Sequence, residues 1–230
     1  MRLYNKLIDE IKSHLSDAES VFSEKKLNIS NKNSVIFLSD SAYELGGNQL
    51  PCVSSLAVSS DKDFSNAIYL QGPDLDEIKA DSPFGKFILI QITDFDDEQE
   101  TFNKIKELEA LRYRLSVDGF MTRASALNMR EQIRVSKKAL KSGIKLADYG
   151  NALLQEYLKF PYVKSAEIFF ITDFYDFDFL NTSAKKISQT TSALNHIFDN
   201  VMFDCSTCNL KEICDEVDGL KELHFKTVKK

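Results

Sequence analysis

The feature that most constrains the fold is the apolar run Phe-Ile-Leu-Ile-Gln-Ile at residues 87–92, the strongest strand signal in the chain. A run of this kind is typical of a strand that is buried on both faces. A second buried strand is expected at 166–172, and shorter strands are expected at 35–38, 53–58 and 68–70. These strands predict a layered sheet inside the protein.

Apolar residues at helical spacing predict several helices between and around the strands. One amphipathic helix is expected over 2–24, and another begins near Asp97, where an acidic first turn favours the helix dipole. Helices are also expected at 146–160 and 182–200, and a helix is preferred for 119–132. The mixture predicts an α/β fold, or a mixed α+β arrangement, with a sheet flanked by helices.

The chain is expected to have three parts: an N-terminal helix at 1–30, an α/β domain at 31–200 and a cysteine-containing, metal-binding tail at 201–230. Its 230 residues carry a net charge of -6 without a strongly basic block, which argues against a nucleic-acid binder. No apolar run approaches the roughly 20 residues that a membrane helix needs, and the charged N-terminus is not a signal peptide. We therefore expect a cytoplasmic protein whose thiols stay reduced.

Three of the four cysteines lie close together as Cys205, Cys208 and Cys214, in the pattern C-x2-C-x5-C. A tight turn can aim the first two sulfurs at one ion, and a short helix can bring Cys214 back to the same point. Reduced, clustered thiols are typical metal ligands, so we predict a metal site in the tail. His224 and Cys52 are the two candidates for the fourth ligand, with an open or partner-completed site as the remaining option.

Five sequence motifs resemble, in their order and spacing, the β subunit of the CO dehydrogenase/acetyl-CoA synthase complex. They are Glu-Leu-Gly-Gly at 44–47, Gly-Pro-Asp-Leu-Asp-Glu-Ile at 72–78, Ser-Pro-Phe-Gly at 82–85, Ile-Arg-Val-Ser-Lys at 133–137 and Ile-Thr-Asp at 171–173. The similarity covers roughly residues 40–175. The resemblance is to the domain that precedes the metal-binding domain of that subunit.

The resemblance implies a metal-binding segment directly after this domain. In the family, that segment holds a four-cysteine iron–sulfur cluster bridged to a nickel pair, with a downstream Cys-Gly-Cys on the outer nickel. Cys205 and Cys208 match the opening pair, Cys214 comes three positions early, and His224 stands at the spacing of the fourth cysteine. No Cys-Gly-Cys follows in this sequence, so we expect no nickel centre of that type.

The metal itself is left open between two candidates. The resemblance and the C-x2-C pair favour a [4Fe–4S] cluster, whereas three cysteines and one histidine in a closed site suit zinc. The resemblance also implies a coenzyme A contact in an arginine-rich stretch beside a tryptophan. The arginines are present, but Gln132 stands in the tryptophan's probable position. Guanidinium groups bind phosphate well, so a coenzyme A-type ligand is the hypothesis for Arg112, Arg114, Arg123, Arg130 and Arg134.

The sequence assigns no catalytic residue and leaves open whether the protein is an enzyme. His14 and His196 have no carboxylate or cysteine partner at useful spacing. The leading hypothesis is an iron–sulfur protein that is an accessory or redox partner in anaerobic one-carbon metabolism, within a CO dehydrogenase/acetyl-CoA synthase-like system. The alternatives are a zinc-stabilised scaffold without catalysis, and an enzyme or binder for a coenzyme A-type ligand.

Overall fold

The computed structural model describes residues 2–228, apart from 24, 31–34, 48, 126 and 199–206, and has the predicted α/β class. Within these residues, five strands form a central sheet. Their order is β1 (Glu19–Val21), β5 (Ala67–Gln71), β10 (Val163–Ile171), β6 (Phe84–Ile92) and β4 (Cys52–Ser59). None of the described helices is long and apolar enough to cross a membrane.

The interior strands β10 and β6 are the two strongest strand predictions. β6 pairs antiparallel with β10 and parallel with β4, and β10 pairs parallel with β5. All but one residue of β6 and all but one of β10 are buried, because layers cover both faces of the sheet. The continuous apolar character of both runs follows from this double burial.

A smaller, antiparallel sheet, here called the outer sheet, packs on one face of the central sheet. It consists of β3 (Ser41–Leu45), β9 (Arg130–Ser136) and β8 (Phe120–Ser125), with β9 in the middle. The short α3 (Lys137–Lys141) follows β9, and β2 (Ile29–Ser30) pairs with β7 (Ser116–Val117).

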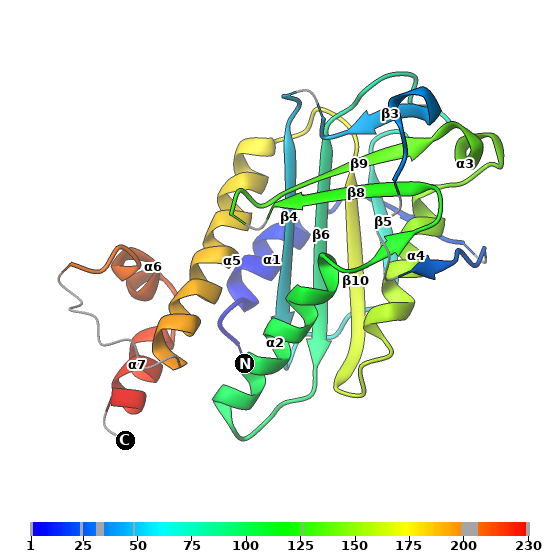
Figure 1. Ribbon diagram of the computed structural model, residues 1–230. Helices are drawn as coiled ribbons and strands as arrows, with labels where there is room; N and C mark the ends of the chain where they lie inside the picture. The colour runs from blue at the N-terminus through cyan, green and yellow to red at the C-terminus, as the bar shows by residue number, and fades with distance from the viewer. Residues whose placement is uncertain are drawn as a thin grey trace.

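Helices complete the layers on both faces of the central sheet (Figure 1). The helices α2 (Glu98–Arg112) and α4 (Leu146–Tyr157) share the face of the outer sheet, and α1 (Asn5–His14) and α5 (Phe177–Phe198) cover the opposite face.

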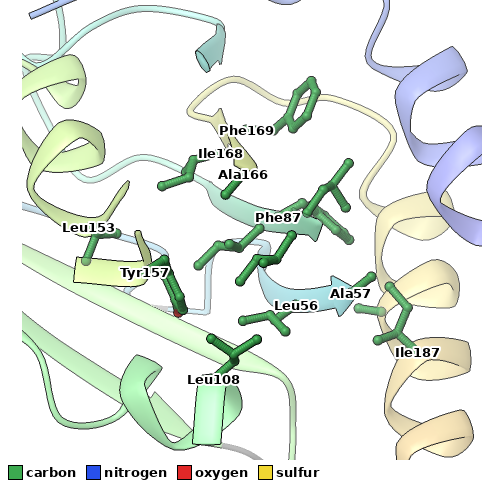
Figure 2. Packing of buried hydrophobic residues seen from close by; sticks show 14 of the residues in the cluster. Leu56, Ala57, Phe87, Leu108, Leu153, Tyr157, Ala166, Ile168, Phe169 and Ile187 are labelled. Atoms are coloured by element: carbon green, nitrogen blue, oxygen red, sulfur yellow. The ribbon is translucent and has the colours of Figure 1, made fainter. Parts of the chain in front are cut away.

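Neighbouring residues of β4 point to opposite faces, as strand geometry requires. Leu56 points toward Leu108 of α2, and Ala57 points toward Ile187 of α5 (Figure 2). Each fully buried leucine or isoleucine side chain contributes about 1.5–3 kcal/mol to folding.

The C-terminal tail packs on α5. It contains α6 (Lys211–Glu216) and α7 (Leu220–Val228), which both contact α5. In Figure 1 these two helices lie at the end of α5 that is far from β3. The tail therefore packs on α5, and Gly219 of the tail also lies beside Leu3 at the N-terminus.

Two predicted helices differ from the structure because strand pairing overrides local periodicity. The helix expected over 2–24 ends at His14, and the residues Glu19–Val21 form β1, which pairs with β5. The stretch 119–132 forms β8 and β9 instead of a helix. Gly119, with a φ of 92°, begins this hairpin in a conformation that an α-helix does not contain.

The buried strand expected at 35–38 is also absent. Ile36 is buried, but Val35, Phe37 and Leu38 are each more than 65% exposed. The Ile36 carbonyl accepts a hydrogen bond from Arg134 of β9, so this segment covers part of the outer sheet instead of joining a sheet.

The helix α4 approaches the central sheet closely at Gly150, and this contact gives the first prediction. A β-carbon at this position would lie 2.9 Å from both Ile68 Cγ2 and Phe170 Cε2. Gly150→Ala should lower the free energy of unfolding by about 1–3 kcal/mol through overpacking, although alanine favours helices. Urea denaturation measures the change. Gln155→Ala, on the exposed side of the same helix, is the control and should be neutral or stabilising.

Candidate functional site

The motifs that carry the resemblance gather at one end of the central sheet. The motif at 44–47 ends β3, and the motif at 82–85 enters β6. The motif at 72–78 follows β5, and the motif at 171–173 leaves β10. The fifth, at 133–137, lies on β9 and pairs with β3. Segments that are far apart in sequence therefore meet in one place.

Hydrogen bonds tie these segments together directly. The Gly46 N–H donates to the Ser82 carbonyl at 2.7 Å, and the Ser82 N–H donates to the Glu44 carbonyl at 3.1 Å. The Ser82 hydroxyl donates to the Thr172 carbonyl at 2.8 Å, and the Thr172 hydroxyl donates to the Pro73 carbonyl at 2.6 Å. The polar groups of the motifs are thus used to hold four chain segments in register.

A buried ionic network connects the central sheet with the outer sheet. Lys86 of β6 pairs with the Glu131 carboxylate of β9, and both side chains are almost fully buried. The Ser54 hydroxyl donates to the second carboxylate oxygen at 3.0 Å. Arg112 of α2 donates to Ser54 Oγ at 2.7 Å and pairs with Glu109.

The electrostatics of this network identify its role. Burial lowers the pKa of the Lys86 ammonium below its usual value, and the facing Glu131 carboxylate opposes this shift. A lysine with a lowered pKa can act as a base in an open site. Lys86 is only 1% exposed, so its charge instead fixes the outer sheet against the central sheet.

The five arginines predicted to contact coenzyme A lie in three different places. Arg112 points between the layers, as described above. Arg123, Arg130 and Arg134 share the face of the outer sheet that points away from the central sheet, since alternate residues of paired strands point the same way. Arg114 is exposed.

Two arginines on that outer face already have protein partners. Arg130 donates to the carbonyls of Gly46 and Leu50, both at 3.2 Å. Arg134 pairs with Glu44 and donates to the Ile36 carbonyl at 2.6 Å. Only Arg114 and Arg123 of the predicted set are exposed to solvent.

Cys52, one candidate for the fourth metal ligand, lies at the start of β4 and is 4% exposed. Its thiol donates to the Glu131 carbonyl at 3.2 Å. Burial raises the pKa of this thiol, which disfavours the thiolate that a metal requires. Cys52 does not line the cavity at the tail.

The tail brings several predicted ligands to one cavity of about 120 Å³. Cys208, Cys214 and His224 line it, and His196 reaches it from α5. Cys205 lies outside the described residues. The sequence spacing of His196 gave no sign of this proximity, because it depends on the packing of α6 and α7 against α5.

The donor atoms at the cavity fit a transition metal in kind. Thiolate sulfur and imidazole nitrogen are ligands of both zinc and iron. The Leu210 N–H donates to Cys208 Sγ at 3.4 Å. Among the described residues, no three His, Cys, Asp or Glu side chains are already arranged to hold an ion. Binding would require these side chains to move toward one another.

The central sheet, outer sheet and motif-bearing end define a layered α/β domain with a cysteine-bearing tail. The family described as CO dehydrogenase/acetyl-CoA synthase complex beta subunit, CdhC, matches residues 32–176, and this chain belongs to that family. The match contains the motif end, the arginines and the buried ion pair, whereas the tail cysteines lie beyond it. A search of curated proteins gave no match to the chain.

Sequence reasoning missed the Lys86–Glu131 pair, although one signal for it exists. Lys86 directly precedes the apolar run at 87–92 and lies within β6. A lysine in a strand buried on both faces must be paired, because an isolated buried charge is strongly unfavourable. The sequence does not indicate which acid provides the pairing.

The buried pair gives the second prediction. Lys86→Met should lower the free energy of unfolding by about 3–5 kcal/mol, because it leaves the Glu131 carboxylate buried without a cation. Chemical denaturation at neutral pH measures the loss. Lys62→Met is the matched control, since Lys62 pairs with Asp9 at the surface and should cost at most about 1 kcal/mol. Equal losses in the two variants would contradict the role given to Lys86.

Proposed function

We propose that this chain is a metal-binding member of the CdhC family that holds an iron–sulfur cluster in its tail. Cys205, Cys208 and Cys214 are the proposed thiolate ligands, with His224 as the candidate imidazole ligand from the tail. The observation that carries the proposal is the cavity lined by Cys208, Cys214 and His224, which adjoins a domain of this family.

The proposed role is an accessory or redox component of anaerobic one-carbon metabolism, in the cytoplasm. A [4Fe–4S] cluster supplies one-electron transfer, and an iron without a cysteine ligand offers a position for a small ligand. The family's description as a subunit of a complex supports a protein partner.

A zinc-stabilised, non-catalytic scaffold is the alternative that the same cavity supports. Cysteine and histidine side chains form closed tetrahedral sites with zinc, which contribute directly to folding. The two tail helices are only six and nine residues long and bury little apolar surface between themselves. Iron or zinc would therefore stabilise them.

Metal analysis of the anaerobically purified protein is the third prediction. The wild-type chain should contain iron and sulfide and absorb visible light. Cys208→Ser should lose most of the metal, because a serine hydroxyl does not replace a thiolate ligand. Elemental analysis and the absorption spectrum measure both changes.

Cys52→Ser is the matched control and should keep its metal, because Cys52 lies in the core away from the cavity. A colourless protein that contains only zinc would contradict the iron–sulfur cluster and support the zinc-stabilised scaffold. A wild-type protein without any metal, or equal metal in wild type and Cys208→Ser, would contradict the proposed site.

The coenzyme A-type ligand is the second candidate function, and the exposed Arg123 on the outer face of β8 favours it. A ligand that binds only the folded state raises the melting temperature, by an amount equivalent to about 2.7 kcal/mol at one hundred times its Kd. If this face binds coenzyme A, a thermal-shift titration will show such a rise, and Arg123→Ala will reduce it. The absence of a rise in the wild type would exclude this candidate.

A further inference from the structure

The cavity at the tail has one wall that belongs to the core of the protein. Ala193, His196 and Ile197 of α5 form this wall, and Cys208 and Cys214 line the same cavity. His196 is the residue of this wall whose side chain carries a metal-binding atom. Cys208, Cys214 and the imidazole of His196 therefore line one partly open cavity.

The position of His196 is fixed by its neighbours on α5. Ala193, Leu194 and Ile197 are buried in the core, and the Phe198 ring stacks on Phe102 of α2 at 5.3 Å between centroids. The backbone of His196 is therefore held in place by the packing of α5 in the core, independently of the tail.

Apolar contacts bring the tail to this wall. Leu210 precedes α6, Ile213 lies on α6, and Leu220 and Leu223 lie on α7; all four are less than 9% exposed. Lys186 of α5 also pairs with Glu216 at the end of α6. These contacts place Cys208 and Cys214 beside α5, although the tail helices are only six and nine residues long.

We propose that His196 is a ligand of the tail metal, so that metal binding fastens the tail to α5. This inference rests on the proposed function, because it assigns a core ligand to the same site. The thiols of the tail lose their protons to solvent when they bind the metal, and His196 binds as the neutral imidazole. The metal then links the cysteines of the tail to the core by coordinate bonds.

The competing ligand is His224, which lines the same cavity from α7. Its neighbour Phe225 is 61% exposed, so this part of the helix has one side toward solvent. A site made of Cys205, Cys208, Cys214 and His224 would lie wholly within the tail. A site that includes His196 connects the tail with the core, and this difference can be measured.

The test uses the full-length chain, purified anaerobically with its native metal, and two measurements. The first is the metal that each variant retains against increasing EDTA, and the second is hydrogen–deuterium exchange of residues 207–228 with and without metal. The variants are His196→Ala, His224→Ala and His196→Cys. Asn195→Ala, the adjacent α5 residue that does not line the cavity, is the control.

His196→Ala should weaken metal retention by about tenfold or more, since even outer-shell partners of a metal affect affinity by this amount. It should also abolish the slowing of exchange that metal produces across 207–228. His196→Cys should recover both properties, because a thiolate is an alternative ligand, whereas a purely structural histidine would not be rescued by cysteine. Asn195→Ala should behave like the wild type.

Two different failures are distinguishable. A wild-type protein that holds no metal would overturn the proposed function and this inference with it. A wild-type protein that holds metal, while His196→Ala keeps the same retention and the same protection, would overturn the inference alone. If His196→Ala does not fold, the test depends on His196→Cys alone. A folded His196→Cys variant that loses the metal would then overturn the inference.

Discussion

The buried pair between Lys86 and Glu131 is the interaction on which the arrangement of the two sheets depends. Both ions are removed from water, and the free-energy cost of that removal is offset only if their geometry is kept. Ser54 satisfies the second carboxylate oxygen, and Arg112 of α2 holds Ser54 in turn. Strands β4, β6 and β9 and helix α2 are therefore joined through polar contacts whose positions are interdependent.

Helix α5 connects two regions of different character. Its first residues follow the motif at 171–173, and its last residues form one wall of the cavity at the cysteine tail. With 22 residues, the helix spans about 33 Å. The family match ends before α5 begins, so the helix carries the chain from the matched domain to the proposed metal site. In Figure 1 the two regions lie at opposite ends of this helix.

The sequence predicted the elements whose signals are local. The buried strands at 87–92 and 166–172 and the helix start at Asp97 are confirmed, and the Asp97 side chain accepts a hydrogen bond from the Gln99 N–H at 2.9 Å. The errors concern segments that depend on distant partners, such as 119–132, where pairing between strands decides the structure. His196 lies near Cys208 and Cys214 because α6 and α7 pack against α5. Hydrophobic periodicity does not reveal such tertiary packing. Cys205 and the identity of the metal stay predictions.

The hydrogen bonds at the motif end have a consequence for how the family is recognised. Gly46 has a φ of 69°, and a β-carbon there would lie 2.6 Å from Cys52 Sγ, so the glycine serves close backbone packing. Ser82 and Thr172 use their hydroxyls to join neighbouring segments. These residues hold neighbouring segments of the scaffold together through hydrogen bonds and close packing. Part of the sequence pattern at this end of the sheet therefore serves the folding of the domain.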